Sequence, residues 1–373
     1  MANSFINSPY KTQRMNWRLF LSEYYGFRSD FLKVEPIGNG LVNHTWIVEQ
    51  NNQKFILQQV NKSVFQQPEL IDKNIKLIGS YFKQNFPGYL FTHPVPDNNG
   101  NTLVQFDNEY YRLFPFIIGS ETFDVVTSTD IAYGAAQQFG KFTKSLSGFN
   151  ANLLNITIPN FHNLSYRFLQ FVDSLKTASK DRLLQAKNEI EILQSHSKLV
   201  TLYEHITDSY LPLYVIHHDT KISNVLFKNK KAVCVIDLDT VMPGYFISDV
   251  GDMMRTYLPT VSENETDLNQ LCIQPGYFEA IAEGYLGKMI DKLTKDEINS
   301  FFYAGQFMIY MQALRFCTDF LNNDVYYGTS YEGQNLCRTK NQLKLLAEYE
   351  NNYNSYTEII RKISTKKTVV SIN

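Results

Sequence analysis

The chain has 373 residues, of which 44% are hydrophobic and 14% aromatic. Because single hydrophobic cores stop growing at roughly 250–300 residues, this length favours two lobes. The 35 basic and 37 acidic residues leave a formal net charge of -2. That balance excludes the basic surface typical of proteins that bind nucleic acids or anionic membranes.

The first twenty residues lack the basic and apolar regions of a secretory signal. No run in the sequence approaches the ~18 apolar residues of a membrane span. The four cysteines are scattered without a C-x-x-C pair, as is typical of reduced core thiols. We therefore expect a cytoplasmic protein that does not enter a membrane.

Short β-prone runs dominate the first third of the chain. Pro68 stands at a first-turn position before a segment with helical spacing of its apolar residues. The predicted elements are strands at 31–40, 43–50, 54–61, 102–106 and 109–117 and a helix at 68–86. This pattern predicts a first lobe over residues 1–118, with a five-stranded antiparallel sheet and one helix.

Long amphipathic segments follow from about residue 128. Helices are predicted at 128–146, 180–200, 277–289, 295–321 and 334–362. Residues 215–244 are the strand-like interruption among them. The sequence thus predicts an α+β protein with a larger, helical second lobe over residues 119–373.

The interruption reads "VIHHDTKISNVLFKNKKAVCVIDLDTVMPG" and carries His217, Asp219, Asn224 and Asp237. This spacing is typical of magnesium-dependent phosphoryl transfer, in which one carboxylate accepts a proton while an amide and a second carboxylate bind the metal. Divalent cations would neutralise the repulsion between the carboxylates. Each aspartate alone could be an ordinary turn residue, but the set of four favours a kinase site.

These segments carry a resemblance to a known family. "HHDTKISNVLF" and "VIDLDTVMPG" resemble the aminoglycoside phosphotransferase and choline kinase superfamily, whose fold is the two-lobed protein-kinase-like one. The segments "FILQQVN", "IPNFHNLSYRF", "DVGDMMRT" and "LRFCTDFLNNDVYY" are similar to the N-acetylhexosamine 1-kinases, over about residues 33–350. The resemblance implies that ATP and Mg²⁺ are used to phosphorylate the anomeric hydroxyl of an N-acetylhexosamine.

The resemblance implies that the lobe at 1–118 binds the nucleotide and that the lobe at 119–373 carries the catalytic loop and the sugar site. It also implies roles for the residues of the interruption. Asp219 would be the general base, and His217 would brace the metal-binding turn. Lys221 either reaches the transferred phosphate or is an exposed loop lysine, and the sequence leaves both interpretations open. The residues implied as metal ligands or metal neighbours are Asn224, Asp237 and Asp239.

The residues expected to bind the nucleotide depart from the protein-kinase pattern. Gly38 and Gly40 lie between two strands, where the absence of side chains lets backbone N–H groups approach phosphates; a plain tight turn is the alternative. The third strand carries Gln58 where kinases place a lysine, and the related hexosamine kinases are similar in this respect. Phe114 and Phe116 mark the segment expected to offer backbone groups to adenine.

The acceptor sugar is expected to bind in the helical lobe through directional hydrogen bonds beside an aromatic wall. Arg315 and Asp319 stand four residues apart, so on a helix they could instead pair with each other. The candidate sugar-binding residues are His162, Arg315, Asp319 and Tyr326.

Other functions on the same fold stay open at this stage. The acceptor could be choline, homoserine, a methylthiosugar or an aminoglycoside, although the mixed charges near residues 315–340 do not form the acidic site that a polycation requires. The missing lysine of the third strand also allows a non-catalytic kinase-like binding protein. The sequence does not determine the oligomeric state.

Overall fold

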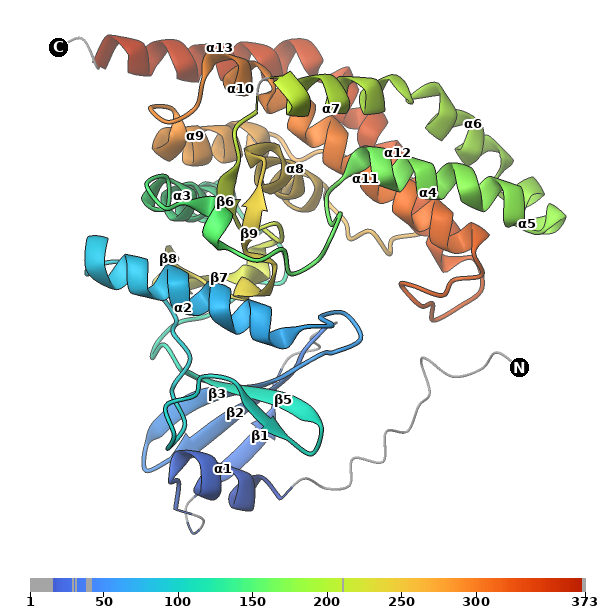
Figure 1. Ribbon diagram of the computed structural model, residues 1–373. Helices are drawn as coiled ribbons and strands as arrows, with labels where there is room; N and C mark the ends of the chain where they lie inside the picture. Colours follow the sequence, from blue (N-terminus) through green and yellow to red (C-terminus); the bar gives the residue numbers. More distant parts are fainter. Residues whose placement is uncertain (1–15, 29, 31, 38–41, 210, 371–373) are drawn as a thin grey trace.

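The computed structural model describes residues 16–28, 30, 32–37, 42–209 and 211–370. Its first part is an antiparallel five-stranded sheet with the order β1-β2-β3-β5-β4, which confirms the predicted small antiparallel lobe. The strands are β1 (Lys33–Pro36), β2 (His44–Gln50), β3 (Gln53–Val60), β4 (Val104–Phe106) and β5 (Glu109–Pro115). Figure 1 shows this sheet apart from most of the helices.

One face of the sheet carries a small core. Successive strand residues point to opposite faces, and Val48, Leu57 and Leu113 are fully buried on the same face. Helix α1 (Trp17–Tyr25), which the sequence analysis did not predict, covers them with Phe20. The alternate residues of β3 and β5 therefore face away from this core.

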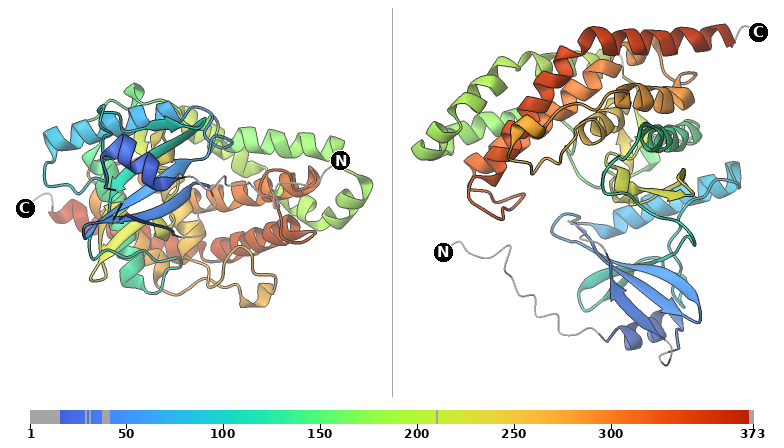
Figure 2. Two further views of the ribbon diagram at one scale, coloured as in Figure 1. Left: turned by 90° about the horizontal axis from the view of Figure 1, so that it is seen from below. Right: turned by 180° about the vertical axis from the view of Figure 1, so that it is seen from behind.

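Helix α2 (Pro68–Asn85) lies between the sheet and the helical lobe in both figures of the whole molecule (Figures 1 and 2). Its buried residues Ile71, Ile75 and Ile78 belong to the large core of the helical lobe. The predicted division of the lobes after residue 118 assigns α2 to the same lobe as the sheet. This division stays a prediction.

The second lobe is helical, as predicted. Its helices are α3 (Thr129–Ser145), α4 (Leu164–Thr177), α5 (Lys180–Gln185), α6 (Lys187–Ser195), α7 (Lys198–Ser209), α8 (Phe246–Tyr257), α9 (Tyr277–Met289), α10 (Lys295–Asn299), α11 (Phe301–Leu321), α12 (Gln334–Asn351) and α13 (Tyr353–Val370). Helix α11 is apolar on nearly every side because α4, α8 and α12 pack around it. The predicted helix at 180–200 is divided among α5, α6 and α7, and the predicted helices at 295–321 and 334–362 are divided at Ser300 and Asn352.

Two short antiparallel pairs interrupt these helices, as the sequence predicts for residues 215–244. Strand β6 (Tyr214–Ile216) pairs with β9 (Met242–Gly244), and β7 (Val225–Lys228) pairs with β8 (Lys231–Val235). These pairings bring the segments that follow β6 and β8 side by side. Within the described part of the chain, every helix is too short or too polar to cross a membrane.

Candidate active site

The loop after β6 is held together by His217. Its Nε2 donates a hydrogen bond to the Ile236 carbonyl at 2.9 Å, and its Nδ1 accepts one from the Asp219 backbone N–H at 3.3 Å. The imidazole is fully buried and touches both segments of the site. This geometry supports the bracing role inferred from the sequence and gives His217 no contact with the cleft.

The Asp219 carboxylate has two partners in its own loop. Its Oδ2 lies 2.9 Å from Lys221 Nζ and accepts a hydrogen bond from Asn224 Nδ2 at 3.0 Å. Burial opposes ionisation, but Lys221, His217 and these hydrogen bonds outweigh it and hold the pKa of Asp219 below its ordinary value. The carboxylate is therefore charged at neutral pH and able to accept a proton.

Asp237 follows β8 in the left-handed conformation, with φ of 60°. Among the described residues, no hydrogen-bond or ion-pair partner contacts its carboxylate. Burial, together with Asp239 and then Asp219, raises the pKa of Asp237 to about 7. A carboxylate in this position is costly to ionise without a cation.

Asp239 is also buried, yet residues of the first lobe engage both of its oxygens. Oδ1 lies 2.6 Å from Arg112 Nη2, and Oδ2 accepts a hydrogen bond from Asn43 Nδ2 at 2.7 Å. Arg112 in turn donates from Nε and Nη2 to Gln58 Oε1, at 3.2 and 3.0 Å. Asp239 therefore links the two lobes.

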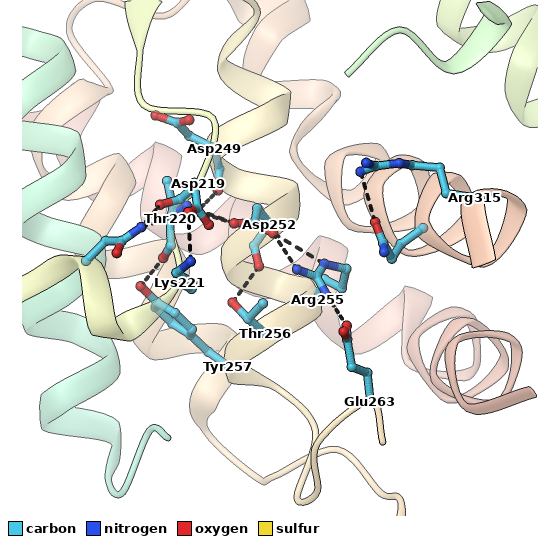
Figure 3. A network of polar contacts seen from close by, with 12 residues as sticks. Asp219, Thr220, Lys221, Asp249, Asp252, Arg255, Thr256, Tyr257, Glu263 and Arg315 are labelled. Carbon is cyan, nitrogen blue, oxygen red and sulfur yellow. Dashed lines mark hydrogen bonds and ion pairs between the residues drawn. The ribbon is translucent and has the colours of Figure 1, made fainter. Parts of the chain in front are cut away.

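Helix α8 lies beside the loop after β6, and its acidic side chains contact that loop (Figure 3). Asp249 accepts the backbone N–H groups of His217 and His218 at 3.0 and 2.7 Å. Asp252 accepts the Thr220 N–H at 2.8 Å, and Tyr257 donates to the Thr220 carbonyl at 2.5 Å.

The sequence analysis gave these helix residues no role. The available signal was the pair of acids three apart on one helix, Asp249 and Asp252, with Arg255 three residues further. Arg255 pairs with Asp252 at 3.0 Å and with Glu263 at 2.9 Å. Gly251 lets α8 approach α11 closely, because a Cβ there would collide with the Ala304 carbonyl.

One cleft of about 2430 Å³ lies between the two lobes and contains residues of both. Such a volume exceeds that of an ordinary small-ligand pocket, ~300–1,000 Å³, and has room for a nucleotide and an acceptor together. The predicted site residues that line it are Gln58, Asp219, Lys221, Asp237, Asp239, Arg315 and Tyr326. Those that do not line it are His217, Asn224, Phe114, Phe116, His162 and Asp319. Gly38 and Gly40 lie outside the described residues.

The part of the cleft next to α11 is aromatic, and Arg315 of this helix lies against its rings. Arg315 lies over the rings of Phe161 and Tyr326 at 5.8 Å each and over Tyr327 at 5.3 Å. Its Nη1 donates to Gln312 Oε1 at 3.3 Å, and it makes no ion pair with another described residue. In Figure 3 its side chain lies apart from the network around Asp252.

His162 and Asp319 do not line the cleft but lie next to residues of its aromatic wall. Burial, and then the neighbouring His218, holds the pKa of His162 well below its usual range, so the ring is neutral. Asp319 does not pair with Arg315. Its oxygens accept the backbone N–H groups of Tyr326 and Tyr327 at 2.7 and 2.9 Å, which fixes the loop that presents these tyrosines.

Replacement of Asp319 by alanine is expected to lower the free energy of unfolding by ~1–3 kcal/mol for each N–H group left without an acceptor. The KM of the acceptor should rise because Tyr326 and Tyr327 lose their fixed position. Chemical denaturation and acceptor titration would measure the two effects. The control is Asp319→Asn, which keeps one acceptor oxygen; its unfolding free energy and its KM should lie between those of the wild type and the alanine variant. An alanine variant with unchanged KM would contradict this role.

Comparison with known proteins identifies the family. A model of a phosphotransferase enzyme family, APH, matches residues 33–286, which is more than half of the chain. The chain belongs to this phosphotransferase family. It is therefore an enzyme, which removes the non-catalytic binding protein from the alternatives.

Solved structures of other phosphotransferases have a similar fold. A microcompartment-associated aminopropanol kinase has a TM-score of 0.60 at 16% identity, covering 91% of this chain and 97% of its own. An amicoumacin kinase with AMP-PNP and Ca²⁺ has a TM-score of 0.60 at 12% identity, covering 89% and 93%. A spectinomycin phosphotransferase with ADP and spectinomycin has a TM-score of 0.54 at 12% identity, covering 93% and 97%. These likenesses confirm the two-lobed kinase-like fold of the APH family.

Proposed function

We propose that this phosphotransferase moves the γ-phosphoryl group of ATP to the anomeric hydroxyl of an N-acetylhexosamine, with Asp219 as the base. The observation that carries this proposal is the position of the charged Asp219 carboxylate in a cleft lined by both lobes, with an aromatic, arginine-bearing wall further along. The sequence likeness to N-acetylhexosamine 1-kinases supports the choice of acceptor.

The proposed reaction needs only one proton transfer, from the acceptor hydroxyl to the protein. The acceptor oxygen forms a bond to the γ-phosphorus as the bond from that phosphorus to the β–γ bridging oxygen breaks, and the hydroxyl proton passes to Asp219. An anomeric hydroxyl is more acidic than an ordinary alcohol, so a carboxylate of low pKa suffices. General-base catalysis of this kind contributes ~10²–10⁴-fold to the rate.

Asn224 and Asp237 fit a magnesium ion. Asn224 turns its Nδ2 toward Asp219, with bonds of 2.9 and 3.0 Å, which leaves its Oδ1 as a ligand. Asp237 lacks a partner among the described residues and has the raised pKa expected of a carboxylate that needs a cation. Magnesium typically takes one or two protein carboxylates and completes its shell with phosphates and water, so the absence of a cluster of three acidic or histidine ligands among the described residues is no obstacle. When bound, the ion would neutralise charge on the phosphates.

The wall near α11 suits a polar, uncharged acceptor. Phe161, Tyr326 and Tyr327 provide apolar faces for a sugar ring, and Arg315 donates hydrogen bonds without a carboxylate partner. An acetamido carbonyl or ring hydroxyls would satisfy these donors. An aminoglycoside or choline would bring its positive charge toward Arg315, which disfavours them.

The test is ATP turnover with magnesium on N-acetylglucosamine, N-acetylgalactosamine, their 1-O-methyl glycosides, glucose, choline and kanamycin. We expect turnover with the free amino sugars and none with the 1-O-methyl forms, because these lack the attacking hydroxyl. Equal turnover of the methyl glycosides would contradict attack from the anomeric oxygen. Turnover confined to choline or kanamycin would overturn the amino-sugar assignment and leave the phosphotransferase intact.

A further inference from the structure

Kinases place a lysine on the third strand to bind the non-transferred phosphates, whereas β3 of this chain carries Gln58. The sheet register sets Gln58 directly opposite Arg112 on β5. Directly opposed residues of an antiparallel pair project from the same face. The Arg112 guanidinium therefore lies on the face of the sheet from which a third-strand lysine would project.

Arg112 is buried, and among the described residues of the sheet it is the one buried cation. Lys54 and Lys62 form ion pairs with Glu49 and Glu109 at 3.8 and 3.7 Å, with partly exposed side chains. Burying a guanidinium is costly unless it is paired. Arg112 does not itself line the cleft, and its buried guanidinium requires an anion beside it.

In the structure that anion is Asp239. Arg112 Nη2 lies 2.6 Å from Asp239 Oδ1, and Nε and Nη2 also donate to Gln58. Within the described part of the chain, Nη1 donates no hydrogen bond. Gln58 and Asp239 both line the cleft, so the guanidinium that they hold lies directly behind two lining residues.

We propose that Arg112 binds the non-transferred phosphates of ATP and so replaces, from β5, the lysine that is missing from β3. Gln58 positions the guanidinium, and Asp239 supplies its counter-ion when the nucleotide is absent. A guanidinium presents planar paired donors that suit phosphate oxygens. This inference rests on the proposed use of ATP.

The test compares the affinities for ATP and adenosine, measured by calorimetry with magnesium, in the wild-type protein and in Arg112→Met. The loss of charge-assisted hydrogen bonds should raise the Kd for ATP by about 10- to 100-fold. The Kd for adenosine, which has no phosphate, should stay unchanged. Arg112→Lys keeps the charge and should recover part of the ATP affinity.

Two further variants keep the test decisive. Arg112→Met leaves Asp239 buried without its partner, so Arg112→Met/Asp239→Asn should restore thermal stability while ATP binding stays weak. Lys54→Met removes one positive charge from the same sheet at an exposed ion pair and should bind ATP as the wild type does.

Other results would count against the proposal. Equal loss of adenosine and ATP binding would show that Arg112 only joins the lobes, and unchanged ATP affinity in Arg112→Met would show that the phosphates bind elsewhere. A wild-type protein that binds neither ligand would instead overturn the use of ATP, and this inference with it.

Discussion

Replacement of Asp219 by asparagine is expected to lower kcat by ~10²–10⁴-fold, the usual contribution of a general base. The amide keeps the shape of the side chain but cannot accept the proton of the attacking hydroxyl. Nucleotide affinity should change little, because phosphoryl transfer depends on separate groups for positioning the phosphates. Initial rates at saturating substrate, together with calorimetric titration of ATP, would measure both quantities.

A matched control is available on the surface. Asp291 pairs with Lys144 at 2.7 Å in an exposed ion pair, and Asp291→Asn should leave kcat and ATP affinity as they are. If Asp219→Asn keeps most of its kcat, or if it loses ATP binding as strongly as turnover, the role of Asp219 as base would be wrong.

Replacement of Asp249 by alanine should damage both stability and turnover. The His217 and His218 N–H groups would lose their acceptor, which costs ~1–3 kcal/mol of unfolding free energy for each buried group. His218 has a φ of 66°, a conformation that a non-glycine residue adopts only when its surroundings impose it. Relaxation of this turn would displace Asp219, and a shift of ~1 Å can lower kcat by ~10²-fold.

Chemical denaturation and initial rates would test this expectation, with Asp249→Asn as the comparison because asparagine keeps one acceptor oxygen. Stability and kcat that are both unchanged in the alanine variant would contradict it.

The contribution of Asp249 to the free energy of unfolding should also depend on pH. Burial raises the pKa of Asp249 to about 6 in the folded protein, against ~4 in the unfolded chain. The folded state therefore keeps the proton to higher pH, and the carboxyl contributes most below about pH 4. The difference in unfolding free energy between the wild type and Asp249→Asn should thus fall as the pH rises from about 4 to about 6.

Most of the order of elements, without α1, α4 and α8, and the candidate catalytic segment could be read from the sequence. Alternating apolar residues predict the strands of the sheet, and Pro68 marks the start of α2 at the observed residue. Asp219, Asn224 and Asp237 lie within nineteen positions of one another, so two short hairpin-like pairings suffice to bring them together. Local spacing determines such a site because few long-range contacts are needed.

The groups that support this segment depend on contacts between distant parts of the chain. Arg112 and Asp239 are separated by more than a hundred residues and meet only because the two lobes pack together. Asp249 finds its N–H partners because Gly251 lets α8 approach α11. By itself the sequence determined the kinase-like succession of a small sheet lobe and a helical lobe, and it picked out the candidate catalytic residues. The tertiary structure alone decided which charges pair across the cleft, because pairing depends on distances that spacing along the chain does not fix.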